Sequence, residues 1–404
     1  MAKDVNPPRG MRDFLPQEKS LRDFVLGKIL AQYKKHGFQE IETPALEDLD
    51  RLTSGQGGDN EKLAFRVLKR GEDLDRALVS AQENADQLAD LGLRFDLTVP
   101  LTRYYATNHA RLPRVFKAIQ TGPVWRAERP QKGRYRQFIQ CDIDIIGEAG
   151  IAAEAELLIA SLSALDAIGL AKAQIRVNHR ALLNQNIQQL GISKDDSASA
   201  MVTIDKLDKI GVDGVSKELA EKFGTEIAEN AKRWLEAIDS TLVPAELTEL
   251  FELVEMVNPG RLQFDPTLVR GMGYYTGTIF EIQHPDSGSS IGGGGRYDGM
   301  VGRWLGSDVP AVGISIGFER AVELVDQRLQ QLPALVLVYE REALSQALDL
   351  QTKAISEGWT ARLEQKPKNL KQLLETMTEQ GFTHFALVDS GTVGFKDLTI
   401  KELG

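Results

Sequence analysis

The sequence is poor in cysteine, in long apolar runs and in histidine, and each scarcity excludes a class of protein. Cys141 is the only cysteine, so no intrachain disulfide can form and a reducing compartment, the cytoplasm, is expected. No stretch of about 18 residues is free of charge, and the N-terminus lacks the apolar segment of a signal peptide. The sequence therefore predicts no membrane association.

Recognisable metal and nucleotide motifs are missing as well. The five histidines show no metal-ligand spacing, and we expect no metal held by a protein-only site. There is no phosphate-binding loop that ends in Gly-Lys-Ser/Thr, and no dinucleotide fingerprint opens a helix after a strand. An ATP site in this chain would be of neither kind.

The charge is present but unevenly distributed. The 404 residues carry 48 basic and 58 acidic side chains, and this net charge of −10 argues against a nucleic-acid partner. Residues 111–140 nevertheless hold eight basic side chains against the single acid Glu128, a local balance of +8 − 1 = +7. This density predicts an anionic partner, with a solvated basic loop as the alternative.

Chain length and apolar periodicity indicate several domains of mixed structure. A length of 404 residues predicts two or three domains, and 42% hydrophobic residues are ordinary for a globular protein. A helix is predicted over 18–36, a helix-compatible segment over 72–91 and a helical insertion from about 180 to 260. Strands are predicted at 38–43, 93–100, 115–119, 124–126, 138–146, 267–284 and 311–317. From 334 onward, strands and helices alternate, which predicts a small α/β domain.

Several side chains are candidates for chemistry, each with a structural alternative. Arg134 and Arg136 are predicted on one face of a strand, while Arg126 and Glu128 could form a simple salt bridge. Glycines 271, 273, 277 and 292–295 predict either close substrate approach or tight hairpins. Asp96, Asp142 and Asp144 stand in apolar surroundings, which predicts a bound ammonium or imidazole, or else an arginine partner. Arg320 could reach a phosphate from a helix start or pair with Glu323.

Taken in order, seven segments resemble the motifs of the histidyl-tRNA synthetase family. They include Leu-Arg-Phe-Asp-Leu-Thr-Val-Pro, Gln-Cys-Asp-Ile-Asp and Gly-Gly-Arg-Tyr-Asp-Gly, and they lie at residues 8–16, 93–100, 126–137, 140–144, 268–276, 294–299 and 313–320. The Asp-Leu-Thr and Gln-Cys-Asp-Ile-Asp variants resemble the branch nearer to eukaryotic and archaeal enzymes.

The resemblance implies an α+β class II synthetase catalytic domain, built on an antiparallel sheet and dimeric through the region around Pro44. It implies a catalytic domain formed by residues 1–179 and 263–329, a helical insertion over 180–262, and a C-terminal α/β anticodon-binding domain over 330–404. The implied activity is that of a histidine–tRNA ligase, whose partners are ATP with Mg²⁺, L-histidine, tRNA-His and a second copy of the chain.

The resemblance also assigns roles to individual residues. Arg126 and Arg320 match the arginines that hold the α-phosphate and the γ-phosphate end of ATP. Glu128 would face the adenine amino group, and Arg134 the phosphate tail. Arg270 matches the arginine that stabilises the α-phosphate in the transition state, so Arg270 and Arg126 are the implied catalytic pair. The implied histidine pocket consists of Asp96, Leu97, Thr98, Arg126, Gln140, Asp144, Arg270, Tyr274 and Tyr275.

The sequence departs from the family pattern at two points, and two alternative functions remain. Gly273 stands where the family more often has aspartate, and residues 331–404 carry 8 basic against 10 acidic side chains. Anticodon contact is therefore expected to be reduced or to use backbone and polar groups. The rivals are a synthetase-like regulatory subunit of histidine biosynthesis, which binds without aminoacylating, and a histidine-sensing domain of a kinase. No kinase signature is present.

Overall fold

The computed structural model describes residues 5–53, 63–80, 85–130, 133–270, 273–326 and 333–403. These residues form two compact units, one made of residues up to 12 together with 26–325, the other of 13–25 together with 326–404. Helix α1 (Pro16–Lys35) confirms the first predicted helix, with Val25, Ile29 and Tyr33 buried along one stripe. Among the described residues, no helix is both long and apolar enough to cross a membrane.

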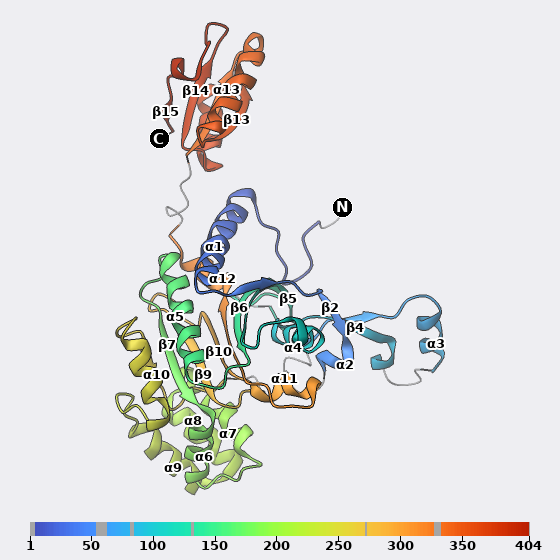
Figure 1. The fold of residues 1–404 in the computed structure, drawn as a ribbon, viewed down its shortest axis with the longest axis vertical. Helices are drawn as coiled ribbons and strands as arrows, with labels where there is room; N and C mark the ends of the chain where they lie inside the picture. The colour runs from blue at the N-terminus through green and yellow to red at the C-terminus, as the bar shows by residue number, and fades with distance from the viewer. Residues whose placement is uncertain are drawn as a thin grey trace. The chain divides into compact units, whose positions relative to one another are not determined.

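The larger unit is built on an eight-stranded sheet in the order β1-β5-β6-β11-β10-β9-β7-β8 (Figure 1). Its strands are β1 (Gln39–Ile41), β5 (Phe116–Trp125), β6 (Gln137–Ile146), β11 (Ala311–Gly317), β10 (Gly292–Arg296), β9 (Thr278–Gln283), β7 (Gln174–His179) and β8 (Leu262–Phe264). Neighbours from β5 to β7 pair antiparallel, while β1 and β8 join in parallel at the edges. The predicted α+β class with a mainly antiparallel sheet is confirmed.

Helix α5 (Ala152–Ala167) covers one face of this sheet. It packs on β6 and β11, and its Glu154 accepts hydrogen bonds from the guanidinium of Arg296 at 2.5 and 2.6 Å. Successive strand residues point to opposite faces, so Gly293 and Gly295, which alternate with Arg296 on β10, face away from α5. Helices α4 (Thr98–Asn108) and α11 (Asp298–Leu305) lie on the other face, where they share a core with Phe116, Ile146 and Ala311. Helix α12 (Phe318–Leu324) contacts β6 and β11.

The predicted helical insertion is confirmed as helix, and it leaves and re-enters the sheet at adjacent strands. Its helices are α6 (Arg180–Gln189), α7 (Ser197–Ile204), α8 (Leu207–Phe223), α9 (Thr225–Glu236) and α10 (Ala245–Glu255). They connect β7 to β8, which lie side by side in parallel. Helices α6–α9 share a core that includes Leu183, Met201 and Leu219 and is joined by Val269 of the loop after β8, whereas α10 packs on α5, β7 and β8.

A three-stranded sheet shows where the predicted boundaries were wrong. Its order is β2-β4-β3, with β2 (Leu46–Asp48), β4 (Ala89–Leu93) and β3 (Arg66–Leu68), and it is accompanied by α2 (Leu49–Leu52) and α3 (Glu72–Ser80). The strand predicted over 93–100 ends at Leu93, and α4 begins at Thr98. Pairing with β2 and β3 fixes the strand, while Asp96 Oδ1 accepts a hydrogen bond from the amide of Val99 in the first turn of α4.

The smaller unit has the predicted alternation of strands and helices. Its sheet order is β13-β12-β14-β15, with β12 (Ala334–Tyr339), β13 (Thr360–Gln365), β14 (His384–Val388) and β15 (Lys401–Glu402), and its helices are α13 (Leu344–Ser356) and α14 (Leu370–Glu379). Strand β12 runs parallel to both neighbours. Leu335 and Leu337 join the cluster that contains α13, whereas Val336 and Val338 join the one that contains α14, so one helix covers each face.

Candidate active site

A cavity of about 1220 Å³ lies over the central strands of the larger unit. It is lined by strands β6, β7, β9, β10 and β11, by the loop before α4, by the loop between β8 and β9, and by the junction of α7 and α8. The structure brings almost all of the predicted site residues together here: Asp96, Thr98, Arg126, Glu128, Arg134, Gln140, Asp144, Arg270, Tyr274, Tyr275 and Arg320. Leu97 is the exception, because its side chain is 1% exposed and does not line the cavity.

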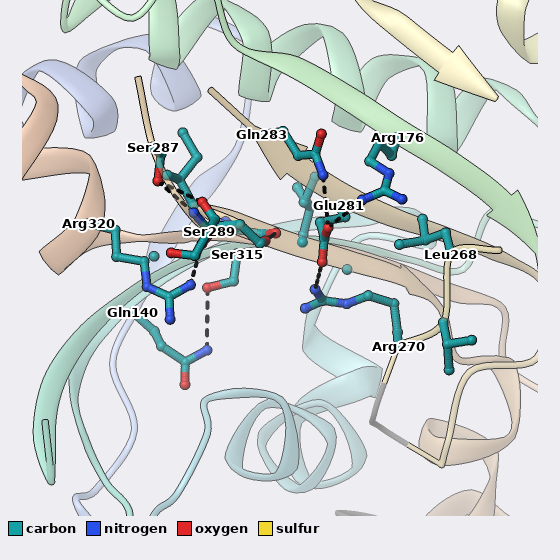
Figure 2. Close-up of a pocket in the computed structure, with 18 of the residues that line it drawn as sticks. Gln140, Arg176, Leu268, Arg270, Glu281, Gln283, Ser287, Ser289, Ser315 and Arg320 are labelled. Atoms are coloured by element: carbon teal, nitrogen blue, oxygen red, sulfur yellow. Dashed lines mark hydrogen bonds and ion pairs between the residues drawn. The ribbon is translucent and has the colours of Figure 1, made fainter. Parts of the chain in front are cut away.

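The floor of the cavity is a single row across the sheet. Strand register aligns Arg176 of β7 with Glu281 of β9, Glu281 with Gly293 of β10, Gly293 with Ser315 of β11, and Ser315 with Asp142 of β6. In Figure 2, Glu281 lies between Arg176 and Arg270, and Ser315 lies near Gln140. Segments separated by more than a hundred residues thus deliver their polar groups to one surface.

Glycines in β10 and β11 leave room for side chains that arrive from elsewhere. A Cβ at Gly293 would lie 2.7 Å from Arg270 Cζ, one at Gly295 would lie 2.8 Å from the ring of Tyr275, and one at Gly313 would overlap Asp144 Oδ1. The prediction of tight hairpins at residues 292–295 is therefore wrong, whereas close substrate approach stays a prediction, because Gly292, Gly293 and Gly294 line the cavity. These glycines belong to a central strand on which the site's own side chains rest.

Three buried carboxylates, Asp96, Asp142 and Asp144, line the cavity. Asp144 Oδ1 accepts a hydrogen bond from Tyr297 Oη at 2.5 Å, and no arginine of the described chain forms an ion pair with Asp142 or Asp144. Burial raises the pKa of Asp144 to about 7, against the lowering effect of the Tyr297 hydrogen bond. Burial and the neighbouring Asp144 raise the pKa of Asp142 well above its ordinary value. A cationic ligand would relieve this cost.

Gln140 presents an acceptor beside these carboxylates. Its Nε2 donates to both oxygens of Asp142 and to Ser315 Oγ, at 3.3 Å in each case. Its Oε1 is buried and has no hydrogen-bond partner within the described residues. Because the amide nitrogen is fixed by two partners, the oxygen is left to accept from a donor that the described residues do not supply.

Aromatic rings close this part of the cavity. The rings of Tyr274 and Tyr275 meet edge to face, with centroids 4.8 Å apart, and Tyr274 lies 6.0 Å from Tyr297 in the same manner. Burial raises the pKa of all three phenols, so they stay neutral hydrogen-bonding groups. They are suited to surround a small planar ring.

Arginines form the anion-binding part of the cavity. Arg126 donates from Nε to the carbonyl oxygen of Phe95 at 3.0 Å, and its guanidinium lies 5.1 Å from the ring centroid of Phe138. Arg320 donates to the carbonyl oxygen of Ser290, and burial together with the charge of Arg134 lowers its pKa. No ion pair between Arg320 and Glu323 is found in the described chain. Cations held close together in this way favour a polyanionic ligand.

Two sequence-based interpretations of the basic segment are corrected. Glu128 pairs with Arg134 at 3.5 Å rather than with Arg126. Arg134 and Arg136 do not share a strand face, because β6 begins only at Gln137. Arg136 instead turns away from the cavity and donates to the carbonyl oxygens of Glu128 and Arg9. The loop over 131–133 and the glycine at 271 lie wholly or partly outside the described residues.

Sequence reasoning assigned no role to Arg176, Glu281, Ser315 or Glu319, and it left Tyr297 within a motif. Glu319 accepts from Arg12 at 2.5 Å and from the amide of Ile139 at 3.2 Å. A signal for Glu281 was present, since it is the one charged side chain within β9. Cys141 is a buried core residue, as predicted. Within the part of the chain that the structure describes, no group of three His, Cys, Asp or Glu side chains could hold a metal.

Comparisons with known proteins show what this chain is similar to. Residues 10–321 match the family model described as histidyl-tRNA synthetase. A protein from Leifsonia xyli subsp. xyli, called histidine–tRNA ligase, is 50% identical over 97% of both chains. One of the same name from Aeropyrum pernix is 38% identical over 78% of this chain and 73% of its own length. Among solved structures, histidyl-tRNA synthetase from Nostoc sp. PCC 7120 has a TM-score of 0.77 at 25% identity, covering 99% of this chain and 95% of its own.

Proposed function

The chain belongs to the histidyl-tRNA synthetase family, and we propose that it acts as a histidine–tRNA ligase through the cavity described above. It activates L-histidine with ATP to histidyl-adenylate and pyrophosphate, then transfers the histidyl group to tRNA-His and releases AMP. The observation that carries the proposal is that one cavity holds both buried carboxylates suited to a cationic amino acid and arginines suited to a polyphosphate.

The histidine subsite consists of the carboxylates, the amide and the tyrosines. Asp96, Asp144 and the free Oε1 of Gln140 accept hydrogen bonds from the ammonium group and imidazole nitrogens of histidine, and Thr98 completes the polar set. Tyr274 and Tyr275 wall the imidazole ring. Arg126 and Arg270 face the substrate carboxylate, which must carry negative charge in order to attack.

The ATP subsite consists of Arg126, Arg134, Arg320 and Glu128. Arg126 binds the α-phosphate, Arg320 the γ-phosphate end and Arg134 the phosphate tail, while Glu128 faces the adenine amino group. Support comes from the position of all four in one cavity and from the pKa of Arg320, which burial first and the charge of Arg134 second lower, so that a bound phosphate would stabilise its charged form.

The chemistry is an in-line displacement. A carboxylate oxygen of histidine attacks the α-phosphorus, and the bond to the pyrophosphate oxygen breaks, so that pyrophosphate leaves with the electron pair. A terminal ribose hydroxyl of the tRNA then attacks the activated carbonyl carbon, and AMP departs. Arg126 and Arg270 stabilise charge at the α-phosphate, and no protein side chain is needed as a nucleophile.

A magnesium ion is expected to accompany ATP, where it supplies positive charge to the phosphate oxygens. The described residues offer no three-ligand cluster to hold it. Glu281, on the cavity floor, is engaged by two arginines. We therefore propose that the ion enters bound to the nucleotide rather than to a protein-only site.

The remaining partners and the domain plan are proposed from the family. We propose a cytoplasmic homodimer that binds tRNA-His, with a catalytic domain of residues 1–179 and 263–329. The insertion over 180–262 is supported by the core that α6–α9 share, and the C-terminal domain over 330–404 by the compact unit that contains it. Because that domain is not basic, tRNA binding should depend on local basic patches and weaken with salt.

Replacing Arg270 by alanine tests the catalytic assignment. Removing one preorganised donor from developing charge typically costs about 100-fold or more in rate, and histidine-dependent ATP–pyrophosphate exchange should fall by that factor. Arg76→Ala is the matched control, because Arg76 is an exposed arginine of α3 that pairs only locally with Asp73. Thermal unfolding should be the same for both variants. An unchanged exchange rate in Arg270→Ala would remove Arg270 from the mechanism.

Charging of tRNA separates the ligase from the regulatory subunit weighed as its rival. A ligase gives exchange and then histidyl-tRNA, whereas a regulatory subunit binds histidine without charging tRNA. Arg126, Arg270 and Arg320 all line the cavity, which supports the ligase. Exchange without charging would point to a different acceptor.

A further inference from the structure

Glu281 lies between two guanidinium groups on the cavity floor (Figure 2). Its Oε2 accepts a hydrogen bond from Arg270 Nη1 at 3.1 Å, and its Oε1 lies 3.5 Å from Arg176 Nη1. Gln283 Nε2 donates to the same Oε1 at 3.4 Å. The Glu281 side chain is 17% exposed, so water screens these contacts only in part.

Arg270 depends on this carboxylate for its position. It belongs to the loop between β8 and β9, outside any helix or strand. Its Nε is buried without a hydrogen-bond partner, and within the described chain the bond to Glu281 is the one hydrogen bond to its guanidinium. A long side chain on a loop samples many rotamers unless a partner selects one.

The register of the sheet directs Glu281 at Arg270. Glu281 of β9 is the cross-strand partner of Gly293 on β10, and the guanidinium of Arg270 lies against that glycine. On its other side, Glu281 is the partner of Arg176 on β7. Arg176 is itself fixed by ion pairs to Asp265 and to Asp208, the latter at 3.0 Å. Arg176 therefore fixes the Glu281 carboxylate on one side, and the carboxylate binds Arg270 on the other.

We propose that Glu281 is a positioning residue for Arg270, which keeps the guanidinium where the transition state needs it and does not itself touch substrate. The inference rests on the role proposed for Arg270. Electrostatic stabilisation by a side chain requires that the charge be in place before reaction, because reorientation during the step would consume the gain. Glu281 supplies that preorganisation from a rigid strand.

Glu281→Gln tests the inference with little change of shape. The amide oxygen can still accept one hydrogen bond but lacks the charge, so the kcat of ATP–pyrophosphate exchange should fall about 10-fold. The KM values for histidine and ATP should stay within about twofold, because the substrate contacts remain. Asp166→Asn is the control, since it weakens a similar pair, to Arg261 at 2.9 Å, outside the cavity. The control should exchange at the parent rate.

A double variant separates positioning from a structural role. If Glu281 acts through Arg270, adding Glu281→Gln to Arg270→Ala should cause no further loss of rate. Losses that multiply would overturn the inference while leaving the proposed function intact. No loss in Arg270→Ala alone would instead overturn the catalytic assignment. Recovery of the Glu281→Gln rate at high Mg²⁺ would show that Glu281 is a metal ligand, and the inference would again be wrong.

Discussion

Replacing Tyr297 by phenylalanine should move the pH dependence of histidine binding to higher pH. Tyr297 Oη donates to Asp144 Oδ1 at 2.5 Å, and both residues are buried. Burial raises the pKa of Asp144 to about 7, and the tyrosine hydrogen bond keeps it from rising further. The phenylalanine variant keeps the ring and removes only the donor. The pKa of Asp144 should therefore increase.

The size of the change follows from the strength of the lost bond. A hydrogen bond to a charged group contributes about 1.5–3 kcal/mol, and 1.36 kcal/mol corresponds to one pKa unit. The pKa of Asp144 should thus rise from about 7 to about 8 or 9. The reason is that the Tyr297 hydroxyl stabilises the ionised form of Asp144, and the phenylalanine variant lacks this hydroxyl.

Histidine binding reports this pKa if Asp144 receives the imidazole. The imidazole has an ordinary pKa of about 6.5, and in a buried pair one shared proton avoids both an unpaired carboxylate and an unpaired cation. Above pH 7 the parent must take up that proton on binding, so its affinity should fall about tenfold per pH unit. In the variant the same decline should begin one to two pH units higher.

Titration calorimetry of histidine between pH 6 and 8.5 measures this directly. Between pH 7 and 8.5 the parent should lose about 15-fold in affinity and Tyr297→Phe only a few-fold. Tyr339→Phe is the control, because Tyr339 lies on β12 of the other unit. Ionisation of the histidine ammonium affects every variant equally. Identical pH profiles for the parent and Tyr297→Phe would refute the shared-proton reasoning.

Three further predictions concern this pocket and the glycine beside its tyrosines. Gly313→Ala should raise the KM for histidine at least about 10-fold and leave that for ATP unchanged, because the new Cβ would overlap Asp144 Oδ1. Gly273→Ala, whose new Cβ meets no atom of the described residues within 4 Å, should leave both KM values within about twofold in the same steady-state assay. Asp144→Asn should become more stable than the parent as pH rises from 4 to 7. Between the ordinary carboxyl pKa of 3.8 and about 7, the folded parent keeps a proton that the unfolded chain has lost, so parental stability falls by at most about 4 kcal/mol. Melting temperatures that shift in parallel across this range would contradict that assignment.

Much of the secondary structure could be predicted from the local periodicity of apolar residues. The stripe of Val25, Ile29 and Tyr33 predicts α1, and the alternation after residue 334 predicts the smaller unit, because both patterns reflect burial on one face. The boundary between β4 and α4 was missed because it depends on partners. Ala89–Leu93 pairs with two strands that are distant in sequence, and a charged, helix-compatible composition does not record that pairing.

The sequence predicted which residues line the cavity, but it did not predict which of them contact one another. Motif resemblance correctly brought Asp144, Gln140 and Arg270 to one place, whereas Leu97, which it also assigned to the histidine pocket, is buried in the core. The partner of Asp144 is Tyr297, which lies between the end of β10 and the start of α11, rather than an arginine, and that pairing depends on how strands distant in sequence align. Sequence spacing specifies which face a residue occupies, but not which residue from another strand lies opposite it.

A chain with a net charge of −10 can form a phosphate-binding cavity because strands from separate segments bring their arginines together. Of the described basic residues in 111–140, only Arg126 and Arg134 line the cavity, while Lys117 pairs with Glu156 and Arg136 with backbone carbonyls. Arg270 and Arg320 come from segments more than 130 residues farther along the chain. The cationic density of the site is therefore created by the sheet, which aligns strands from separate segments. A count of charges along the sequence located the right region but misjudged which cations form the site.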